Sequence, residues 1–474
     1  MKEKKEFILK TLKLLSIIIL YYIIGKKNIF LYVLSITLYN IFTSCFNHIS
    51  IKENLSKIET KKSKYKLFKL LLLVMTIISF LFLLLSIFIS DFLSIFLNIN
   101  NITLIFIFEG LSIITKPLVK LLSEYLQNIK NNYNYNKLIN IFNILDNVLL
   151  LIIALFTFRI LKLKENIAIS LLYLSKILST IIILLILYLI NRPLKQIKER
   201  KEDKINYSKE LKKILTKNSY QSTISIVKNS YYYISIIILY LVLNTRYNYE
   251  SRELSKIITF IYFYSLSIIE YLIFLAKSIT KTLPNENRII EKLYKTFKMS
   301  LTITIIFGII SPLTCKVIFN NSNMSIYLIM ANILAIFILL YDITYDNIKN
   351  KTVIYISLIV GIIFKIVLVI PLINSFYRMG YNLIYGDIIS TSIAMFISII
   401  INYIYLKNIE KSQIKYFEKI LDILYDNILL CIILILVQFI IPIDTSNYIK
   451  SLGLIIIYII ISIAFIKLKN KKRG

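Results

Sequence analysis

Apolar residues occur along this chain in long continuous runs, separated by short segments that hold most of the charge. The runs are roughly 20 residues long, the length that a helix needs to cross about 30 Å of hydrocarbon. Backbone N–H and C=O groups find no water there, so a spanning segment must be a helix or part of a closed barrel. A barrel strand would alternate apolar and polar residues, and these runs do not alternate. The pattern therefore predicts an all-α membrane protein.

The runs predict about fourteen transmembrane helices, numbered here in chain order. They cover residues 7–24, 29–47, 69–90, 102–126, 138–160, 166–190, 220–243, 256–276, 298–319, 325–345, 352–374, 382–406, 424–442 and 450–467. The first run follows a short basic start and has no small-residue cleavage site. We therefore expect it to be a retained span, not a signal peptide.

Lysine and arginine are concentrated in every second segment between the spans. Segments 52–66, 192–217, 281–295 and 407–419 and both ends of the chain are basic, whereas 91–101 and 320–324 contain no Lys or Arg. Arg159, Lys162 and Lys164 are the main exceptions. Cytoplasmic loops hold the excess of Lys and Arg, so this alternation predicts a multi-pass protein of the cytoplasmic (inner) membrane with both termini cytoplasmic.

The longest polar segment, 192–217, separates two sets of six spans. It holds ten basic and four acidic residues, and it is far too short to bury a core of its own. We predict an N-terminal six-helix lobe at 1–191, a cytoplasmic basic linker at 192–217, a C-terminal six-helix lobe at 218–406, and an appended helix pair with a basic tail at 407–474.

The composition excludes a soluble globular protein, because 57% of the residues are hydrophobic and the mean hydropathy is +0.73. A net charge of +31 would indicate nucleic acid in a soluble protein, but here the bases lie between spans, where they set topology and meet anionic lipid. The three cysteines fit neither a metal site nor a disulfide framework. No phosphate-binding glycine loop, metal-ligand cluster or nucleophile motif is present, so we predict no catalytic residue, no metal and no cofactor.

The tetrapeptide Asn-Ile-Lys-Asn occurs twice, at 128–131 after span four and at 347–350 after span ten. Counting 18 residues forward from the first asparagine of each copy reaches Asp146 in span five and Lys365 in span eleven. The two copies lie six spans apart, which indicates two six-helix halves in parallel orientation. Internal repeats of this kind are typical of transporters.

Several stretches resemble a known family of transporters. They are Ile23 to Tyr32, with a glycine turn after the first span; Tyr125 to Asn131 and Asp342 to Asn350, which follow spans four and ten; and Gly361 to Gly380, where Lys365, Pro371 and Gly380 match a spaced "K…LIP…G" pattern. With the arrangement of six, six and two spans, they resemble the polysaccharide flippases of the multidrug/oligosaccharidyl-lipid/polysaccharide exporter superfamily, near the stage V sporulation protein B-like group and the lipid II flippases.

The resemblance implies a fold of two pseudo-symmetric six-helix lobes plus an appended helix pair, and a function without covalent chemistry. Such a flippase translocates an anionic lipid-linked saccharide, a polyprenyl-diphosphate precursor of the cell wall or of a surface polysaccharide, by alternating access. The resemblance also implies two kinds of partner, the lipid-linked substrate and the membrane lipids. Where the lipid II branch has an arginine-rich motif in the first span, this chain has only Lys10 and Lys13.

Charged residues within spans are costly and usually face a wet interior or a partner. A flippase of this family needs an aqueous cationic cavity between its halves, which lysine supplies as a point charge. We predict the substrate-binding residues Lys228, Lys365 and Lys176, with Lys10 and Lys13 at the cytoplasmic mouth, and the ion-coupling or pairing residues Asp146, Glu270 and Glu109. Coupling to sodium ions or protons is left open. Glu109 and Lys116, seven residues apart, are expected on one helix face, although Lys116 is close enough to the span end to reach the interface instead.

Two other functions stay open on the sequence alone. A membrane-embedded polyprenyl-phosphate glycosyltransferase or polymerase would need acidic, His or Arg residues on a sizeable outer loop, and the best group here is Glu250 and Glu253 beside Arg252. A multidrug or cation exporter of the same superfamily would favour acidic cavity residues, whereas the deep charges here are mostly basic. The sequence identifies neither the saccharide, nor the direction of transport, nor the oligomeric state.

Overall fold

The structure is a computed structural model that describes residues 2–473, except 26–28, 48, 98–101, 130–134, 191–205, 218, 248–249, 282–288, 349 and 411–415. All regular elements within the described residues are helical. Packing divides the chain into two compact units, residues 1–241 and 242–474, called unit 1 and unit 2 below. The finer division into two lobes, a linker and an appended pair stays a prediction.

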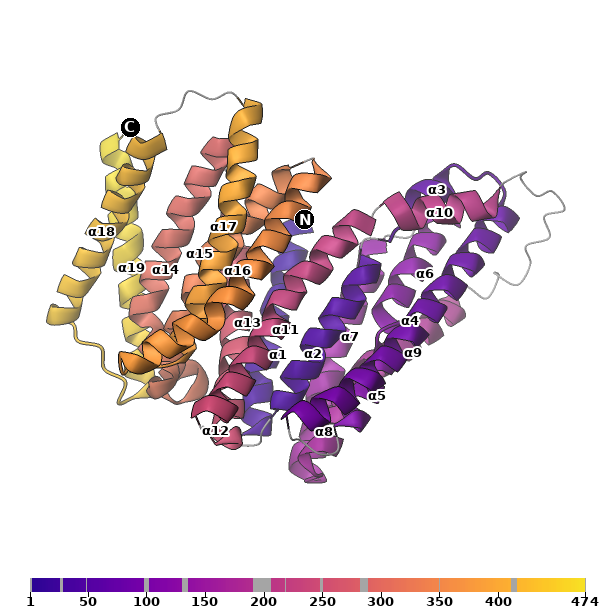
Figure 1. The fold of residues 1–474 in the computed structure, drawn as a ribbon, viewed down its shortest axis with the longest axis horizontal. Coiled ribbons are helices and arrows are strands. Elements are labelled where there is room, and N and C mark those ends of the chain that lie inside the picture. Colours follow the sequence, from indigo (N-terminus) through magenta and orange to yellow (C-terminus); the bar gives the residue numbers. More distant parts are fainter. Residues whose placement is uncertain are drawn as a thin grey trace. The chain divides into compact units, whose positions relative to one another are not determined.

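Unit 1 contains the first eleven numbered helices (Figure 1). Its helices are α1 (Lys2–Ile24), α2 (Phe30–Asn47), α3 (Lys52–Ser56), α4 (Lys61–Leu97), α5 (Thr103–Ser112), α6 (Thr115–Ile129), α7 (Tyr135–Ala154) continued by a π-helical turn (Leu155–Ile160), α8 (Glu165–Leu172), α9 (Leu174–Ile190), α10 (Tyr207–Lys217) and α11 (Ser219–Tyr247), whose last residues belong to unit 2.

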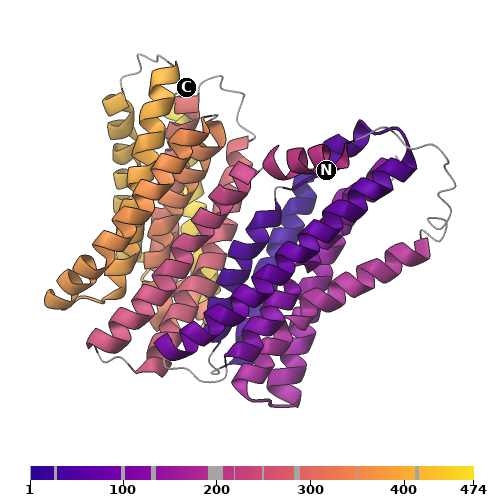
Figure 2. The ribbon, with the colours of Figure 1, turned by 45° about the vertical axis from the view of Figure 1, so that its right-hand side comes forward.

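Unit 2 contains the remaining helices, which run side by side in Figure 2 in pink, orange and yellow. They are α12 (Ser251–Thr259), a π-helical segment (Phe260–Ser265), α13 (Leu266–Lys281), α14 (Ile289–Phe319), a short 3₁₀ turn (Ser322–Met324), α15 (Ser325–Asn347), α16 (Lys351–Arg378), α17 (Ile384–Glu410), α18 (Tyr416–Ile440) and α19 (Tyr448–Arg473).

The predicted membrane spans are found as helices. Twelve helical segments in the described ranges are long and apolar enough to cross a membrane. The other two predicted spans are α2, whose apolar part Phe30–Phe46 is shorter, and span four, which is split into α5 and α6. Large apolar side chains such as Phe88 and Phe439 are exposed on helix surfaces, as expected where the surrounding solvent is lipid. The prediction of an all-α multi-pass membrane fold of about fourteen spans is confirmed.

Span four is interrupted because of Pro117. The ring of a proline inside a helix clashes with the carbonyl four residues earlier and its nitrogen has no hydrogen to donate, and the residue four positions before Pro117 is Ile113. Helix α5 ends at Ser112 and α6 begins at Thr115. The expectation that Glu109 and Lys116 share one face of a continuous helix is therefore wrong.

Some helices extend well beyond the predicted spans. Helix α4 starts at Lys61 and not at residue 69, and α14 starts at Ile289 and not at residue 298. Hydropathy marks only the part of a helix that lies in hydrocarbon, whereas helical hydrogen bonds also form in the polar residues that continue it. Part of the predicted linker is also helical: α10 lies beside α3 (Figure 1), where Asn54 Nδ2 donates to Glu210 Oε2 over 2.7 Å and Ile214 is buried.

The core of unit 2 depends on a very close approach of α16 and α17. A Cβ atom added at Gly386 would lie 2.5 Å from the backbone nitrogen of Ile373, so only glycine fits at this contact. Helices α18 and α19 pack against α14. Two polar contacts join α14 to α18: Lys298 to Asp426 at 2.8 Å and Thr302 to Asn427 at 2.9 Å.

Candidate functional site

The most concentrated group of charges within the spans of unit 1 comes from four helices. Lys10 and Lys13 lie on α1, Lys116 on α6, Asp146 on α7 and Lys176 on α9. Lys116 interacts electrostatically with all four of the others. We call these five residues the lysine cluster.

The pair Asp146 and Lys176 forms the inner part of the cluster. Lys176 Nζ lies 2.8 Å from Asp146 Oδ2, and Ser175 Oγ donates to Asp146 Oδ1 over 2.6 Å. The ammonium also lies 5.1 Å from the centroid of the Tyr39 ring, within the range of a cation–π interaction. The two charged side chains keep 14% and 18% of their surface exposed, so the protein does not enclose the pair completely.

Lys116 is the least neutralised member of the cluster. Its side chain is exposed, and within the described residues it forms neither a hydrogen bond nor an ion pair at 4 Å. Lys13 is exposed as well, and Lys10 is half-buried. The cluster thus places three more lysines and one carboxylate, that of Asp146, within electrostatic reach of Lys116.

Two helix interruptions place Lys116 and Lys176 at equivalent positions in their helices. Lys116 is the second residue of α6, directly after the break caused by Pro117. Lys176 is the third residue of α9, directly after the turn at Tyr173 that separates α8 from α9. The N-terminal end of a helix carries a partial positive charge, and half-helix N-termini in transporters point at anionic substrate groups. The backbone therefore adds to the positive potential of the two lysines.

Unit 2 contains a second intramembrane ion pair, formed by Lys365 on α16 and Asp387 on α17. Lys365 Nζ donates to Asp387 Oδ1 and to three more oxygens: Asp387 O at 2.9 Å, Ser390 Oγ at 2.9 Å and Thr391 Oγ1 at 2.6 Å. Tyr262 Oη donates to the other carboxylate oxygen. The exposed fractions of the two charged side chains are 1% and 0%. We call this arrangement the Lys365 clamp.

The clamp and the pair in unit 1 have opposite polarity. Asp146 and Lys365 are the two residues that lie 18 positions after the repeated tetrapeptide, and each is bonded to an opposite charge on the next span. In unit 1 the acid lies on the earlier helix, α7, and the base on α9. In unit 2 the base lies on the earlier helix, α16, and the acid on α17. They also differ in exposure, since the side chains are 14% and 18% exposed in the pair of unit 1 but 1% and 0% exposed in the clamp.

The remaining predicted site residues are placed as follows. Glu109 on α5 is completely buried in unit 1 and accepts a hydrogen bond from Ser86 Oγ on α4 over 2.7 Å. Glu270 on α13 is exposed. Lys228 lies in α11, but its side chain is outside the described residues. The structure thus brings Lys10, Lys13, Lys176 and Asp146 together, while Lys365 lies in unit 2 and is saturated by its own neighbours.

Sequence reasoning missed Asp387, the partner of Lys365. This residue is the sixth position of the predicted span 382–406, where a carboxylate suggests the water interface and not the interior. A usable signal was the series of hydroxyl and carboxyl groups at Asp387, Ser390 and Thr391, which recur at helical spacing on one face. A face of this kind inside an apolar helix needs a polar partner, and Lys365 is that partner.

Arg159, an exception to the charge alternation, has a local partner. Its guanidinium donates to the carbonyl oxygen of Tyr22 over 2.5 Å, in the last turn of α1. The last carbonyls of a helix have no partners within it and carry partial negative charge, so a cation is favourable there. Arg159 therefore has a structural role that loop charge counting does not reveal.

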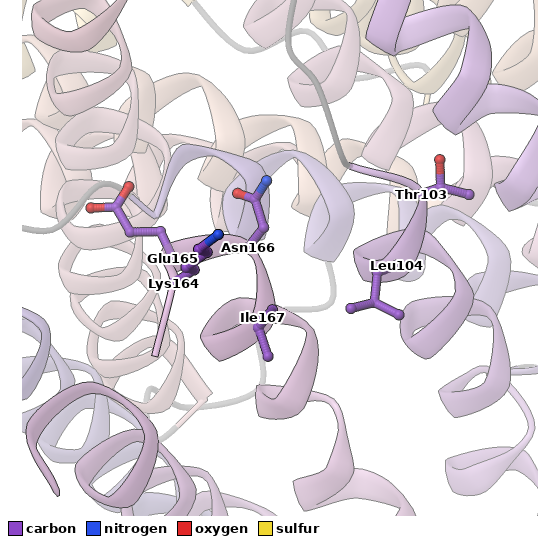
Figure 3. Close-up of a pocket in the computed structure, with 6 residues that line it drawn as sticks. All are labelled: Thr103, Leu104, Lys164, Glu165, Asn166 and Ile167. Atoms are coloured by element: carbon purple, nitrogen blue, oxygen red, sulfur yellow. The ribbon is translucent and has the colours of Figure 1, made fainter. Parts of the chain in front are cut away.

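A separate pocket of about 680 Å³ lies where α5 and α8 begin (Figure 3). It is lined by Thr103, Leu104, Lys164, Glu165, Asn166 and Ile167. In Figure 3, Asn166 lies between the two helix ends, whereas the Glu165 carboxylate points away from α5. Its single lysine is balanced by a glutamate, so this pocket lacks an unpaired ammonium like that of Lys116.

Two solved structures have the same fold. A lipid II flippase MurJ in an inward closed conformation matches with a TM-score of 0.66 and 14% sequence identity, over 99% of this chain and 98% of the flippase. A MOP superfamily transporter from Pyrococcus furiosus matches with a TM-score of 0.51 and 13% identity, over 85% of this chain and 93% of that protein. No family model and no curated protein sequence matches the chain.

These matches confirm at the level of the fold the resemblance found in the sequence. The two proteins are described as a flippase and a transporter. With its all-helical membrane spans, the chain has the fold of the transporters of the multidrug/oligosaccharidyl-lipid/polysaccharide exporter superfamily.

Proposed function

We propose that this protein is a flippase that carries an anionic lipid-linked saccharide across the cytoplasmic membrane, with both termini cytoplasmic. The observation that supports it most directly is Lys116, which forms no ion pair within the described residues and lies in the electrostatic reach of three more lysines of unit 1. Uncompensated charge within a membrane span is expensive and marks substrate or ion pathways. The charge of Lys116 is positive, so the cargo that fits it carries negative charge.

A diphosphate headgroup suits this cluster for reasons of geometry as well as charge. Lys116 has an exposed, unpaired ammonium, and Lys176 is held by Asp146 in a pair that is partly exposed. Both follow helix N-termini, which bind phosphate through backbone dipoles. Lysine binds phosphate as a point charge without fixed orientation, which allows the headgroup to bind and to leave again.

Lys10 and Lys13 belong to the same proposed site, and Asp146 is its pairing residue. Lys365 was predicted as a substrate ligand, but its ammonium already meets four oxygens. It would have to leave the clamp before it could contact cargo. Lys116, which the sequence assigned to the interface or to a pair with Glu109, takes its place in the proposal.

A cation exporter of the same fold is the alternative, and the charges of unit 1 argue against it. A cationic drug would be repelled by the unpaired ammonium of Lys116. Two acids of unit 1 are not free to attract one: Asp146, a member of the cluster, is bonded to Lys176, and Glu109 is inaccessible at 0% exposure.

Transport into proteoliposomes tests the proposal. The purified protein is reconstituted with a fluorescent polyprenyl-diphosphate saccharide, and the label that reaches the far leaflet is followed by chemical quenching. Lys116→Gln should lower the initial rate roughly 10- to 100-fold, because one hydrogen bond to a charged group contributes about 1.5–3 kcal/mol. Lys256→Gln, an exposed lysine on α12, is the matched control and should leave the rate unchanged.

The assay separates the candidate functions. A rate that does not change in Lys116→Gln, with the cargo still moved, would reject the lysine cluster as its site. Failure of the wild type to move the lipid, together with uptake of a cationic dye by the same vesicles, would reject the flippase and support the exporter.

A further inference from the structure

Glu109 is an acidic residue inside unit 1 that forms no ion pair with a cation of the described residues. Its side chain has 0% exposure. Oε2 accepts a hydrogen bond from Ser86 Oγ over 2.7 Å, whereas Oε1 is buried and has no hydrogen-bond partner within the described residues. An ionised carboxylate in such a site would lose its whole hydration shell and would gain only one hydrogen bond in its place.

The titratable groups that face Glu109 are tyrosines. Tyr39 on α2, Tyr173 between α8 and α9, and Tyr233 on α11 interact with it electrostatically. The contact from α4 is the neutral hydroxyl of Ser86. Lys176, on the adjacent helix α9, is bonded to Asp146 instead, so none of these neighbours offers Glu109 a positive charge.

One side of the carboxyl group is closed by tight packing. A Cβ atom added at the neighbouring Gly110 would lie 2.5 Å from Leu83 Cδ1 and 3.0 Å from Leu83 Cα, so α4 and α5 are in direct contact there. On the α11 side, Tyr233 Oη is buried and also lacks a hydrogen-bond partner within the described residues. Glu109 Oε1 and Tyr233 Oη are thus two buried polar atoms without a hydrogen-bond partner among the described residues, and their side chains interact electrostatically.

We propose that Glu109 is a proton-binding site of unit 1, with Tyr233 as the group through which the proton exchanges. A buried carboxyl group without a cation is stable only in its neutral form. The proton is therefore bound while Glu109 is enclosed by α4 and α11, and it leaves when a rearrangement of these helices admits water. The protein binds and releases one proton per opening of this site, whatever its cargo is.

Counting protons on unfolding tests the occupancy. At pH 7 an unfolded glutamate is ionised, so a proton held by Glu109 in the folded protein is released when SDS unfolds it. Wild-type protein in weakly buffered detergent should release one proton more per molecule than Glu109→Gln. Glu6→Gln, at an exposed glutamate of the same unit, is the matched control and should release as many protons as the wild type. Equal release by wild type and Glu109→Gln would overturn the proposal.

Infrared spectroscopy gives a second measurement, which needs no folded Gln variant. The folded wild type at pH 7 should show the C=O band of a neutral carboxylic acid, the band should shift in Glu109→Asp, and it should disappear on unfolding. A folded wild type without such a band would also overturn the proposal. Tyr233→Phe should keep the band but slow its hydrogen–deuterium exchange, and unchanged exchange would reject the role of Tyr233.

Discussion

Replacing Lys365 by methionine tests how a fully buried ion pair contributes to the stability of unit 2. Methionine keeps most of the length and volume of the side chain, so the main change is the loss of the ammonium. Asp387 then remains at 0% exposure with a hydrogen bond from Tyr262 but no cation. Ser390 and Thr391 still donate to the carbonyl oxygen of Asp387, so the loss is concentrated on the carboxylate.

The magnitude follows from burial. Removal of one partner from a buried ion pair costs about 3–5 kcal/mol, because the other charge is left uncompensated. Lys176→Met removes the same kind of charge from a pair whose side chains are 14% and 18% exposed. Asp146 is partly exposed there, and exposed pairs contribute only about 0–1 kcal/mol, so we expect a clearly smaller loss. Lys176→Met is thus the matched control.

The assay is equilibrium unfolding in mixed detergent, with the free energy of unfolding taken for each variant. Lys365→Met combined with Asp387→Asn should recover at least half of the loss, because the amide oxygen still accepts the bond from Tyr262 and no charge is left behind. Equal losses for Lys365→Met and Lys176→Met, or no recovery in the double variant, would refute the reasoning from burial.

Two further substitutions test how the helices are held. Gly386→Ala should destabilise unit 2 by about 1–3 kcal/mol, since its Cβ would meet the backbone of Ile373 at 2.5 Å. In the same unfolding assay, Gly453→Ala, whose Cβ would have no atom within 4 Å, should leave the stability unchanged or raise it by up to about 1 kcal/mol. Equal effects of the two substitutions would contradict the packing argument. Arg159→Gln should cost about 0.3–1 kcal/mol through the lost charge at the Tyr22 carbonyl, with a difference from wild type that shrinks at high salt; a salt-independent loss would point to packing instead.

The spans could be predicted from the sequence because hydrocarbon permits few alternatives. Runs of apolar residues mark where a helix must be, and every predicted span is helical in the structure. Hydropathy does not show where a helix extends into water, so the starts of α4 and α14 were placed too late. The break in span four was encoded by Pro117, but proline is frequent in membrane helices and its effect depends on what packs around it.

The sequence predicted which charged residues lie inside spans, but it did not predict which side chains these residues contact. The sequence identified Lys176 and Asp146 as charges inside spans, but they are 30 residues apart and no spacing rule joins them. Lys365 was predicted to face an aqueous cavity because its position in a span is deep, whereas its neighbours on α17 determine what it meets. Depth in the membrane can be taken from the sequence, and the orientation of a side chain about the helix axis comes from tertiary packing.

The exposures of the two ion pairs argue for different roles of the two halves of the repeat. A lysine can exchange its own carboxylate for a phosphate only if its ammonium is never both unpaired and shielded from water. An unpaired buried charge costs several kcal/mol. The partial exposure of the Lys176–Asp146 pair lowers that barrier. The Lys365 clamp has no such exposure, and its four oxygens would all be abandoned together. The inverted polarity fits this division, because the carboxylate of Asp146 on α7 leaves the cation on α9, within electrostatic reach of Lys116 at the start of α6. The proposed exchange with an anionic headgroup is therefore assigned to unit 1, while the same sequence position in unit 2 holds two helices together.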